Sequence, residues 1–336
     1  MNPQDRFKDY KGGKCWQAYI SEVNRASDLQ EAGLTEDDAL KLRTGDFEFA
    51  YVPSEEKELC KEIKEFIMRH EWLAKLPNRP THRFTARLKK SGQLAGTIIM
   101  AVPNAFSNLL GKENSNKEKL ISRGACISWG PKNLGSWLIM QSIRWMAKNT
   151  DFRYFTAYSD PEAKELGTIY QACNFHYLGQ TSGTNFQYLD PDRKERGWFS
   201  DREFRKKSSY MKYAEKISPG FYKKIGMGDY ETRMFGFISW AKAKETPASA
   251  KEATPLASKW VPNWEIMNKE YPGLEEELKR LQAEHIKKCK KRKVLAKHKY
   301  CYILGRGKKE TKFLLAKFAE NSPNKQNIPY PTIRGK

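Results

Sequence analysis

Residues 120–180 read LISRGACISWGPKNLGSWLIMQSIRWMAKNTDFRYFTAYSDPEAKELGTIYQACNFHYLGQ. Short apolar runs alternate there with longer segments whose apolar residues recur at helical spacing. The stretch predicts, in order, a strand, a polar loop, a helix, a strand, an acidic turn, a second helix and another strand. Polar residues collect where the predicted strands end. Because open α/β sheets bind ligands beyond the carboxyl ends of their strands, this pattern predicts the core of a ligand-binding α/β fold.

The sequence on either side supplies further elements of the same fold. A helix is predicted over residues 54–76, where apolar residues recur every three or four positions. Four segments have the composition of strands: FEFAYVP (47–53), HRFTARLK (82–89), LAGTIIMAVP (94–103) and KHKYCYILG (297–305). The last of these is expected to return to the same sheet as the others.

Composition divides the chain into four segments: a leader (1–45), a core (46–235), a linker with an amphipathic helix (236–285) and a basic C-terminal segment (286–336). The leader is polar and is expected to pack loosely. The linker contains the low-complexity stretch AKAKETPASAKEATPLAS (241–258). The amphipathic helix that follows is predicted to extend to Lys293, with its charge running from acidic to basic as the helix dipole favours.

The charge of the chain is strongly positive. Lys and Arg number 61 against 40 Asp and Glu, which gives a formal net charge of +21. Such an excess suits a polyanion partner, either nucleic acid or an anionic membrane face, although a basic soluble protein without such a partner is an alternative. Residues 286–312 contain twelve Lys or Arg and one acidic residue, Glu310. The candidate contacts to a polyanion such as nucleic acid are Lys287, Lys288, Lys290, Lys291, Arg292 and Lys293.

The cysteines and the apolar runs bear on the cellular compartment. The six cysteines are scattered and form no CxxC pair, and the first residues are polar. The longest apolar runs are shorter than the roughly twenty residues that span a bilayer. We therefore expect reduced thiols, no structural zinc site, no membrane association and a cytoplasmic protein.

The loop at residues 130–136 joins a predicted strand to a predicted helix. Its glycines free the backbone, Ser136 can cap the helix, and the amides at a helix start can bind a phosphate or an oxyanion. An ordinary strand-to-helix turn would have the same composition. The candidate cofactor-binding residues are Lys132, Asn133, Gly135 and Ser136.

Five other residues have chemistry suited to a site. Asp160 precedes a proline at the end of a strand, so it can cap the next helix or orient and deprotonate an amine. Tyr170 lies in that helix, where most tyrosines only pack. Arg123 at the start of a strand could bind a phosphate or a carboxylate, or form a surface ion pair. His70 lies near the end of the first long helix, where a cation interacts favourably with the helix dipole, so its default role is structural. With Glu71 and Asp160 it could instead supply a metal site of two carboxylates and one histidine.

The order of these motifs resembles a known family. A strand with Ser122-Arg123, a Pro-Lys-Asn-x-x-Ser loop and YSDPEAKELGTIYQACNF (158–175) together resemble the Mom-type DNA adenine-modification proteins of bacteriophages, a divergent branch of the GNAT acyltransferase superfamily. The resemblance covers residues 45–235 and 297–331. It implies a GNAT-like α/β (α+β) fold with a mixed, mostly antiparallel central sheet flanked by helices, and with basic helical additions at the C-terminus.

The resemblance also implies an activity and its site. The activity is conversion of adenine N6 in double-stranded phage DNA to the N6-carbamoylmethyl form, inside an infected bacterium, as protection from restriction enzymes. The family's functional positions fall on His70, Arg123, Ser136, Asp160 and Tyr170. The chain departs from the family at Glu71, which stands where an aromatic residue is expected. This departure weakens the case for iron binding at His70 and Asp160. Residues 131–136 also differ from the pyrophosphate-binding loop of the GNAT superfamily, which weakens the case for coenzyme A binding.

The residues suggest how such a reaction could proceed. Asp160 would orient or deprotonate the adenine amine, and Tyr170 would donate or relay a proton. Arg123 would hold an anionic part of the donor, while Ser136 and its loop amides would stabilise oxyanion charge. The sequence does not identify the donor. Acetyl-coenzyme A and an aminoacyl donor such as a charged tRNA are the candidates. Acetyl transfer alone cannot supply the nitrogen of the carbamoylmethyl group, whereas an aminoacyl donor would fit both that nitrogen and the basic surface.

Two other functions fit the same sequence. One is an acyl-coenzyme A N-acyltransferase acting on a small amine or a protein, which would bind coenzyme A and need no DNA. The other is a non-catalytic DNA-binding protein, in which the basic residues would matter and Asp160 would not.

Overall fold

A computed structural model of the chain describes residues 14–77, 79–103, 105–181, 185–192, 194, 197–200, 219–220, 269 and 272–332. The chain forms two compact units, one of residues 1–183 with 295–336 and one of residues 184–294. This division differs from the four segments expected from composition, because its boundary at residue 183 lies within the expected core. The low-complexity stretch at 241–258 lies outside the described residues.

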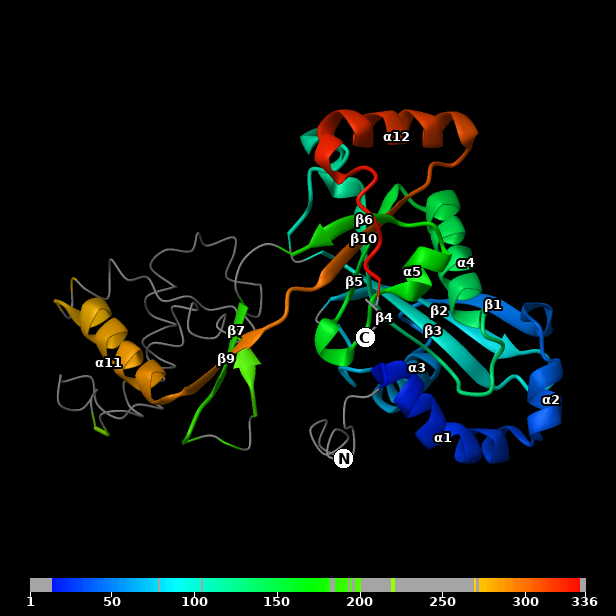
Figure 1. Cartoon of the computed structure of the whole chain (residues 1–336), viewed down its shortest axis with the longest axis horizontal. Coiled ribbons are helices and arrows are strands. Elements are labelled where there is room, and N and C mark those ends of the chain that lie inside the picture. Colours follow the sequence, from blue (N-terminus) through cyan, green and yellow to red (C-terminus); the bar gives the residue numbers. More distant parts are fainter. Residues whose placement is uncertain are drawn as a thin grey trace. The chain divides into compact units, whose positions relative to one another are not determined.

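The first unit is built on a seven-stranded sheet with the order β1-β2-β3-β4-β5-β10-β6 (Figure 1). Its strands are β1 (Phe47–Val52), β2 (Pro80–Leu88), β3 (Leu94–Ala101), β4 (Glu118–Cys126), β5 (Tyr154–Ser159), β10 (His298–Ile303) and β6 (His176–Gln180). Only the β4–β5 pair is parallel, and the other neighbours in this sheet are antiparallel. The predicted mixed, mostly antiparallel sheet is confirmed, and so is the return of the late strand, because β10 lies between β5 and β6.

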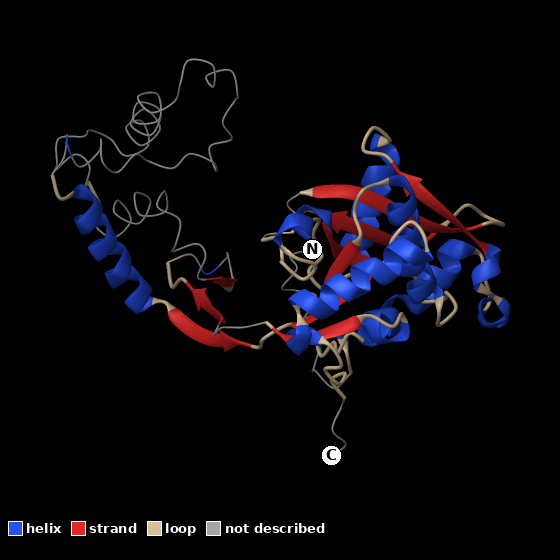
Figure 2. Ribbon diagram, turned by 90° about the horizontal axis from the view of Figure 1, so that it is seen from above, coloured by secondary structure: helices blue, strands red, loops and turns tan. Residues whose placement is uncertain are grey.

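Helices gather around this sheet (Figure 2). They are α1 (Trp16–Ala32), α2 (Glu36–Lys41), α3 (Lys57–His70), α4 (Leu134–Asn149), α5 (Thr168–Ala172) and α12 (Lys308–Asn321). All eight residues of β3 are buried, and both α3 and α4 contact this strand. Ile63 of α3 and Leu138 of α4 belong to the same apolar cluster as Ile99 of β3, so these helices close the core. Within the described residues, no helix is long and apolar enough to cross a bilayer.

The sheet opens between β4 and β5. The two strands pair from Glu118 with Tyr154 to Ile121 with Ala157, and the pairing ends there. On the other side of β4, Ile99 pairs with Arg123 and the next pair is Met100 with Ile121, so Ser122 is an extra residue. Such a β-bulge bends its strand and re-aims the side chains beside it. Residues 122–126 of β4 and residues 158–159 of β5 therefore diverge, with their carboxyl ends on the same side.

Two expectations for local structure are wrong. The leader is not loosely packed throughout, because α1 has 17 residues and its Trp16 is fully buried against Ile20 and Ala163. The helix expected after Asp160 is broken into a 3₁₀ turn, η4 (Pro161–Ala163), and the short α5. Between them Gly167 has φ +71°, a conformation that glycine adopts readily and other residues rarely do.

The second unit contains a three-stranded sheet with the order β8-β7-β9 and one described long helix. The strands are β7 (Asn185–Leu189), β8 (Phe199–Ser200) and β9 (Lys290–Val294), and the helix is α11 (Leu274–Lys288). The helix expected to reach Lys293 ends at Lys288, and the next basic residues form β9. Lys-Lys-Arg-Lys has no apolar face for a helix to bury, and these four residues, together with Val294, instead pair with β7 over five positions.

Candidate active site

Six side chains near the opening of the sheet interact electrostatically and form what we call the charged cluster: Glu71, Arg123, Asp160, Glu165, Tyr170 and Lys297. Glu71 follows α3, Arg123 follows the bulge of β4, and Asp160 follows β5. Glu165 comes from the turn before α5, Tyr170 from α5 itself, and Lys297 directly precedes β10. The opening of the sheet and the insertion of β10 therefore gather groups that are far apart in the sequence.

Asp160 has two partners. Its Oδ2 lies 2.7 Å from Nζ of Lys297, and its Oδ1 accepts a hydrogen bond of 3.1 Å from the backbone N–H of Glu162. The second bond caps η4, so the capping role expected for Asp160 is confirmed. The side chain is 13% exposed, so little of it is open to solvent.

Glu165 is a titratable group that the sequence did not single out. Burial raises its pKa to about 7, and the negative charges of Glu71 and Asp160 act in the same direction. Burial also raises the pKa of Glu71, although the charge of Arg123 and the N–H groups of Leu73 and Ala74 oppose the shift. A carboxyl group with a pKa near 7 can take or release a proton at neutral pH.

Tyr170 is held in its protonated form beside these carboxylates. Burial raises its pKa, and the charges of Glu165 and Glu71 raise it further. Its ring centroid lies 5.3 Å from those of both Phe175 and Tyr300, so its orientation is fixed by packing. At neutral pH it can donate a hydrogen bond but cannot act as a phenolate.

Arg123 is anchored rather than free in solution. Its Nε donates to the carbonyl of Lys75 at 2.8 Å, and its Nη1 donates to the carbonyl of Ser122 at 2.5 Å. Nε also lies 3.9 Å from Oε2 of Glu71. The guanidinium thus connects the bulge of β4 to the loop after α3 and places a positive charge at the acidic group.

Ser136 does not cap α4, because it is the third residue of that helix and Asn133 precedes the first turn. Its hydroxyl donates to the carbonyl of Asn133 at 3.0 Å. A Cβ on Gly135 would lie 2.7 Å from Cδ1 of Ile169, so the first turn of α4 packs closely against α5. Lys132 and Asn133 are exposed. Among the contacts of the described residues, none joins Ser136 to the charged cluster.

His70 is the last residue of α3 and directly precedes Glu71 of the charged cluster. It is buried at the end of α3, with its ring 4.4 Å from that of Phe66, and its Nδ1 lies 3.4 Å from Nδ2 of Asn24. Within the described part of the chain, the group of side chains arranged to hold a metal ion lies in the second unit and contains neither His70 nor Asp160. The metal site considered for these two residues therefore has no support from this geometry.

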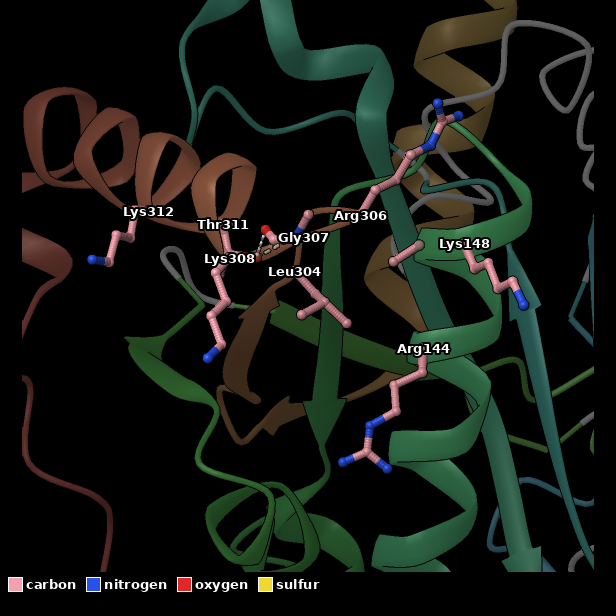
Figure 3. Close-up of a pocket in the computed structure, with 10 residues that line it drawn as sticks. Arg144, Lys148, Leu304, Arg306, Gly307, Lys308, Thr311 and Lys312 are labelled. Atoms are coloured by element: carbon pink, nitrogen blue, oxygen red, sulfur yellow. Dashed lines mark hydrogen bonds between the residues drawn. The ribbon is translucent and has the colours of Figure 1, made fainter.

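The first unit also has an open pocket of about 560 Å³, which we call the basic pocket (Figure 3). It is lined by Arg144, Ala147 and Lys148 of α4, by residues 304–307, and by Lys308, Thr311 and Lys312 of α12. Arg144 and Lys308 extend toward the same side of the pocket, whereas Arg306 points away and pairs with Asp151 at 3.0 Å (Figure 3). No side chain caps α12, so the amides of its first turn add to the positive potential.

The second unit presents the six cations that the sequence marked as DNA contacts. All six are exposed; two lie at the end of α11 and four on β9. Nζ of Lys291 lies 3.8 Å from the ring centroid of Phe186, and the guanidinium of Arg292 lies 4.7 Å from that of Trp198. A strand that carries exposed cations beside aromatic rings is a suitable surface for nucleic acid.

Several acetyltransferases are among the solved structures that are similar to this chain. The ribosomal-protein-S5-alanine acetyltransferase from Vibrio fischeri is 15% identical with a TM-score of 0.26, and the alignment covers 38% of this chain and 59% of that chain. The ribosomal-protein-S18-alanine N-acetyltransferase from Escherichia coli is 11% identical with a TM-score of 0.28, covering 43% and 82%. The IAA acetyltransferase from Bacillus cereus ATCC 14579 is 13% identical with a TM-score of 0.27, covering 44% and 84%.

No curated protein matches the chain. A comparison of the sequence with models of protein families gives a more specific result. The model of the Mom protein family matches residues 58–255, which is more than half of the chain and includes five of the six residues of the charged cluster. The chain therefore belongs to the Mom protein family.

Proposed function

We propose that this chain is a DNA-modifying transferase that converts adenine N6 to the N6-carbamoylmethyl form and so protects phage DNA from restriction. The observation that carries the proposal is the match to the Mom family over residues 58–255. The charged cluster at the opening of the sheet supports it, because it supplies proton-transfer groups. The basic pocket and the cations of β9 support a polyanionic substrate.

The chemistry requires a base because the lone pair of adenine N6 is delocalised into the ring. During the transfer this lone pair forms a new N–C bond, one N6 proton leaves to a base, and the donor's leaving group departs with its bonding electrons. Glu165 is the best placed group for that proton, since its pKa of about 7 leaves a large deprotonated fraction at neutral pH.

The neighbours of Glu165 have complementary roles in the proposal. Asp160 orients the amine while Lys297 balances its charge at 2.7 Å. Tyr170, held protonated, donates a hydrogen bond to the reacting group. Arg123 binds an anionic part of the donor from its anchored position. The target adenine must leave the DNA stack to reach these groups, at a cost of a few kcal/mol that phosphate contacts can offset.

The basic pocket leads to a testable expectation about DNA affinity. Arg144→Gln and Lys308→Gln are each expected to weaken DNA binding by a similar factor for all sequences. Each should also reduce the slope of log affinity against log salt by about 1, because each removes one phosphate contact. Fluorescence anisotropy with labelled duplexes at several salt concentrations measures both quantities.

Lys317→Gln is the matched control for this test. Lys317 lies later in the same helix and pairs with Glu320 at 2.9 Å, outside the basic pocket. An unchanged salt slope in both pocket variants would remove the pocket from the DNA interface.

Nucleoside mass spectrometry tests the function directly. We expect DNA from bacteria that express the chain to contain a new adenine derivative with the mass of the N6-carbamoylmethyl form. Asp160→Asn should remove this derivative while leaving DNA binding in place, since the basic surfaces are unchanged. Soluble chain in two different bacterial hosts with unaltered nucleosides would overturn the proposal.

The same experiment separates the two alternative functions. An acyl-coenzyme A N-acyltransferase would leave the nucleosides unmodified, and the purified chain would bind coenzyme A without DNA. A non-catalytic DNA-binding protein would protect DNA equally well with Asp160→Asn. In that case charge reversals at Lys290 and Arg292 would abolish its effect.

A further inference from the structure

Three buried side chains of different chemical types converge in the second unit. Asp190 directly follows β7, His285 lies in the last turn of α11, and Cys289 is the residue directly after this helix. Each offers one atom able to bind a metal, and these atoms all lie within 4.8 Å of one another. Asp190 and His285 are each 1% exposed, and Cys289 is 8% exposed.

The spacing of these residues explains why they meet. His285 and Cys289 are four positions apart, so they lie one above the other on the same face of the helix end. Asp190 reaches them from the end of β7, where its Oδ2 lies 3.1 Å from Nε2 of His285. The pairing of β7 with β9, which begins one residue after Cys289, holds the two segments in register.

The donor set matches one metal better than others. Zinc binds thiolate sulfur, imidazole nitrogen and carboxylate oxygen, whereas magnesium and calcium select oxygen ligands almost alone. Copper in its reduced form prefers sulfur, and this group has a single thiol. The three described ligands leave a fourth coordination position, which zinc can fill with water or another donor.

Asp192 adds an independent feature of zinc sites. Its Oδ2 lies 3.8 Å from Nδ1 of His285, the ring nitrogen that does not face Asp190. Histidines that bind a metal through one nitrogen usually present the other to a carboxylate, which fixes the tautomer and the ring orientation. Asp190 and Asp192 thus face the two nitrogens of one imidazole, with Asp190 at 3.1 Å and Asp192 at 3.8 Å, a distance just beyond a hydrogen bond.

We propose that Asp190, His285 and Cys289 bind a zinc ion, with Asp192 as the positioning residue for the imidazole. This differs from the expectation, based on scattered cysteines, that the chain has no zinc site. The ion connects the end of β7 to the end of α11 immediately before β9. Its role is therefore to hold the basic strand in place, since a metal that binds only the folded arrangement stabilises it.

The test measures zinc in the purified full-length chain by plasma mass spectrometry after removal of loosely bound metal. We expect one zinc ion per chain, a loss of this ion in Cys289→Ser and in His285→Asn, and an affinity about 10–100-fold weaker in Asp192→Asn. Cys60→Ser is the matched control, because Cys60 is a free, half-buried thiol in the other unit and should retain the zinc.

Cobalt substitution guards against variants that fail to fold. Cobalt added to the wild-type chain should give a thiolate-to-cobalt charge-transfer absorption that Cys60→Ser retains and Cys289→Ser lacks. A folded wild-type chain that binds neither metal would overturn the proposal, and the contact between Asp190 and His285 would then be a hydrogen bond alone. Zinc retained in Cys289→Ser would overturn it as well. Neither result depends on whether the chain modifies DNA.

Discussion

Replacing Glu165 with glutamine is expected to lower the rate of adenine modification by about 10²–10⁴-fold, the usual contribution of a general base. Glutamine has nearly the same shape but cannot accept the N6 proton. The rate is measured as the accumulation of modified adenine in DNA after expression begins, per amount of soluble chain. Modification at the wild-type rate would exclude Glu165 as the base.

The pH dependence of the reaction follows from the same group. Because Glu165 must be deprotonated to act, the wild-type rate should rise with pH through about 7 and then level off. Glutamine removes this rise, so the residual activity of the variant should be nearly independent of pH in this range. A lysate in which the wild-type chain modifies added plasmid DNA allows both profiles to be measured.

Stability gives an independent check that the variant is folded. Because the folded state raises the pKa of Glu165 from 4.5 to about 7, it binds the proton more tightly than the unfolded state does. The contribution of Glu165 to stability is therefore complete below about pH 4.5 and is lost as the pH rises through 7. At pH 8 we expect Glu165→Gln to be more stable than the wild-type chain by up to about 3 kcal/mol in urea unfolding. At pH 5 the difference should be much smaller.

Glu162→Gln is the matched control for Glu165→Gln. Glu162 lies three residues earlier and outside the charged cluster, where its Oε1 accepts from the N–H of Leu295 at 3.4 Å. This variant should keep both the modification rate and the pH profile. An equal loss of activity in the two variants would indicate a disturbed loop rather than a missing base.

The sequence predicts the sheet well because its strands have a strong local pattern. Alternation and β-branched residues mark β2, β3 and β5, and the register follows once their apolar faces are buried. The DPEA motif marks Asp160 as a cap, and the structure shows that bond. These features depend on neighbours in the sequence, which a pattern can reveal.

Features that depend on distant segments could not be predicted in the same way. Glu165 was expected on a continuous helix, where a glutamate is usually a solvated charge. Its burial arises because Lys164 and Gly167 have positive φ values and break that helix. The pairing of Asp160 with Lys297 exists because β10 is inserted beside β5. The basic pocket likewise joins α4 to α12, and only the folded chain shows this combination.

The break before α5 leads to the second prediction with a large effect, the substitution Gly167→Ala. We expect it to destabilise the first unit by about 3 kcal/mol in urea unfolding. Part of this is the cost of a side chain at φ +71°, about 1–2 kcal/mol. The rest is steric, because a Cβ at this position would lie 2.5 Å from the ring of Tyr300. The hydroxyl of Tyr300 also donates to the carbonyl of Leu166, so the backbone here has little freedom to move away.

Gly92→Ala separates the two contributions. Gly92 has φ +73° but no atom within 4 Å of a Cβ, so alanine there should show only the conformational cost of about 1–2 kcal/mol. The Tyr300→Leu change tests the steric part, because leucine is shorter and makes room for the new methyl group. The double variant Gly167→Ala with Tyr300→Leu should therefore be less destabilised than the sum of the single variants. Strict additivity would show that the ring of Tyr300 does not press on residue 167, and that this glycine is required for its backbone conformation alone.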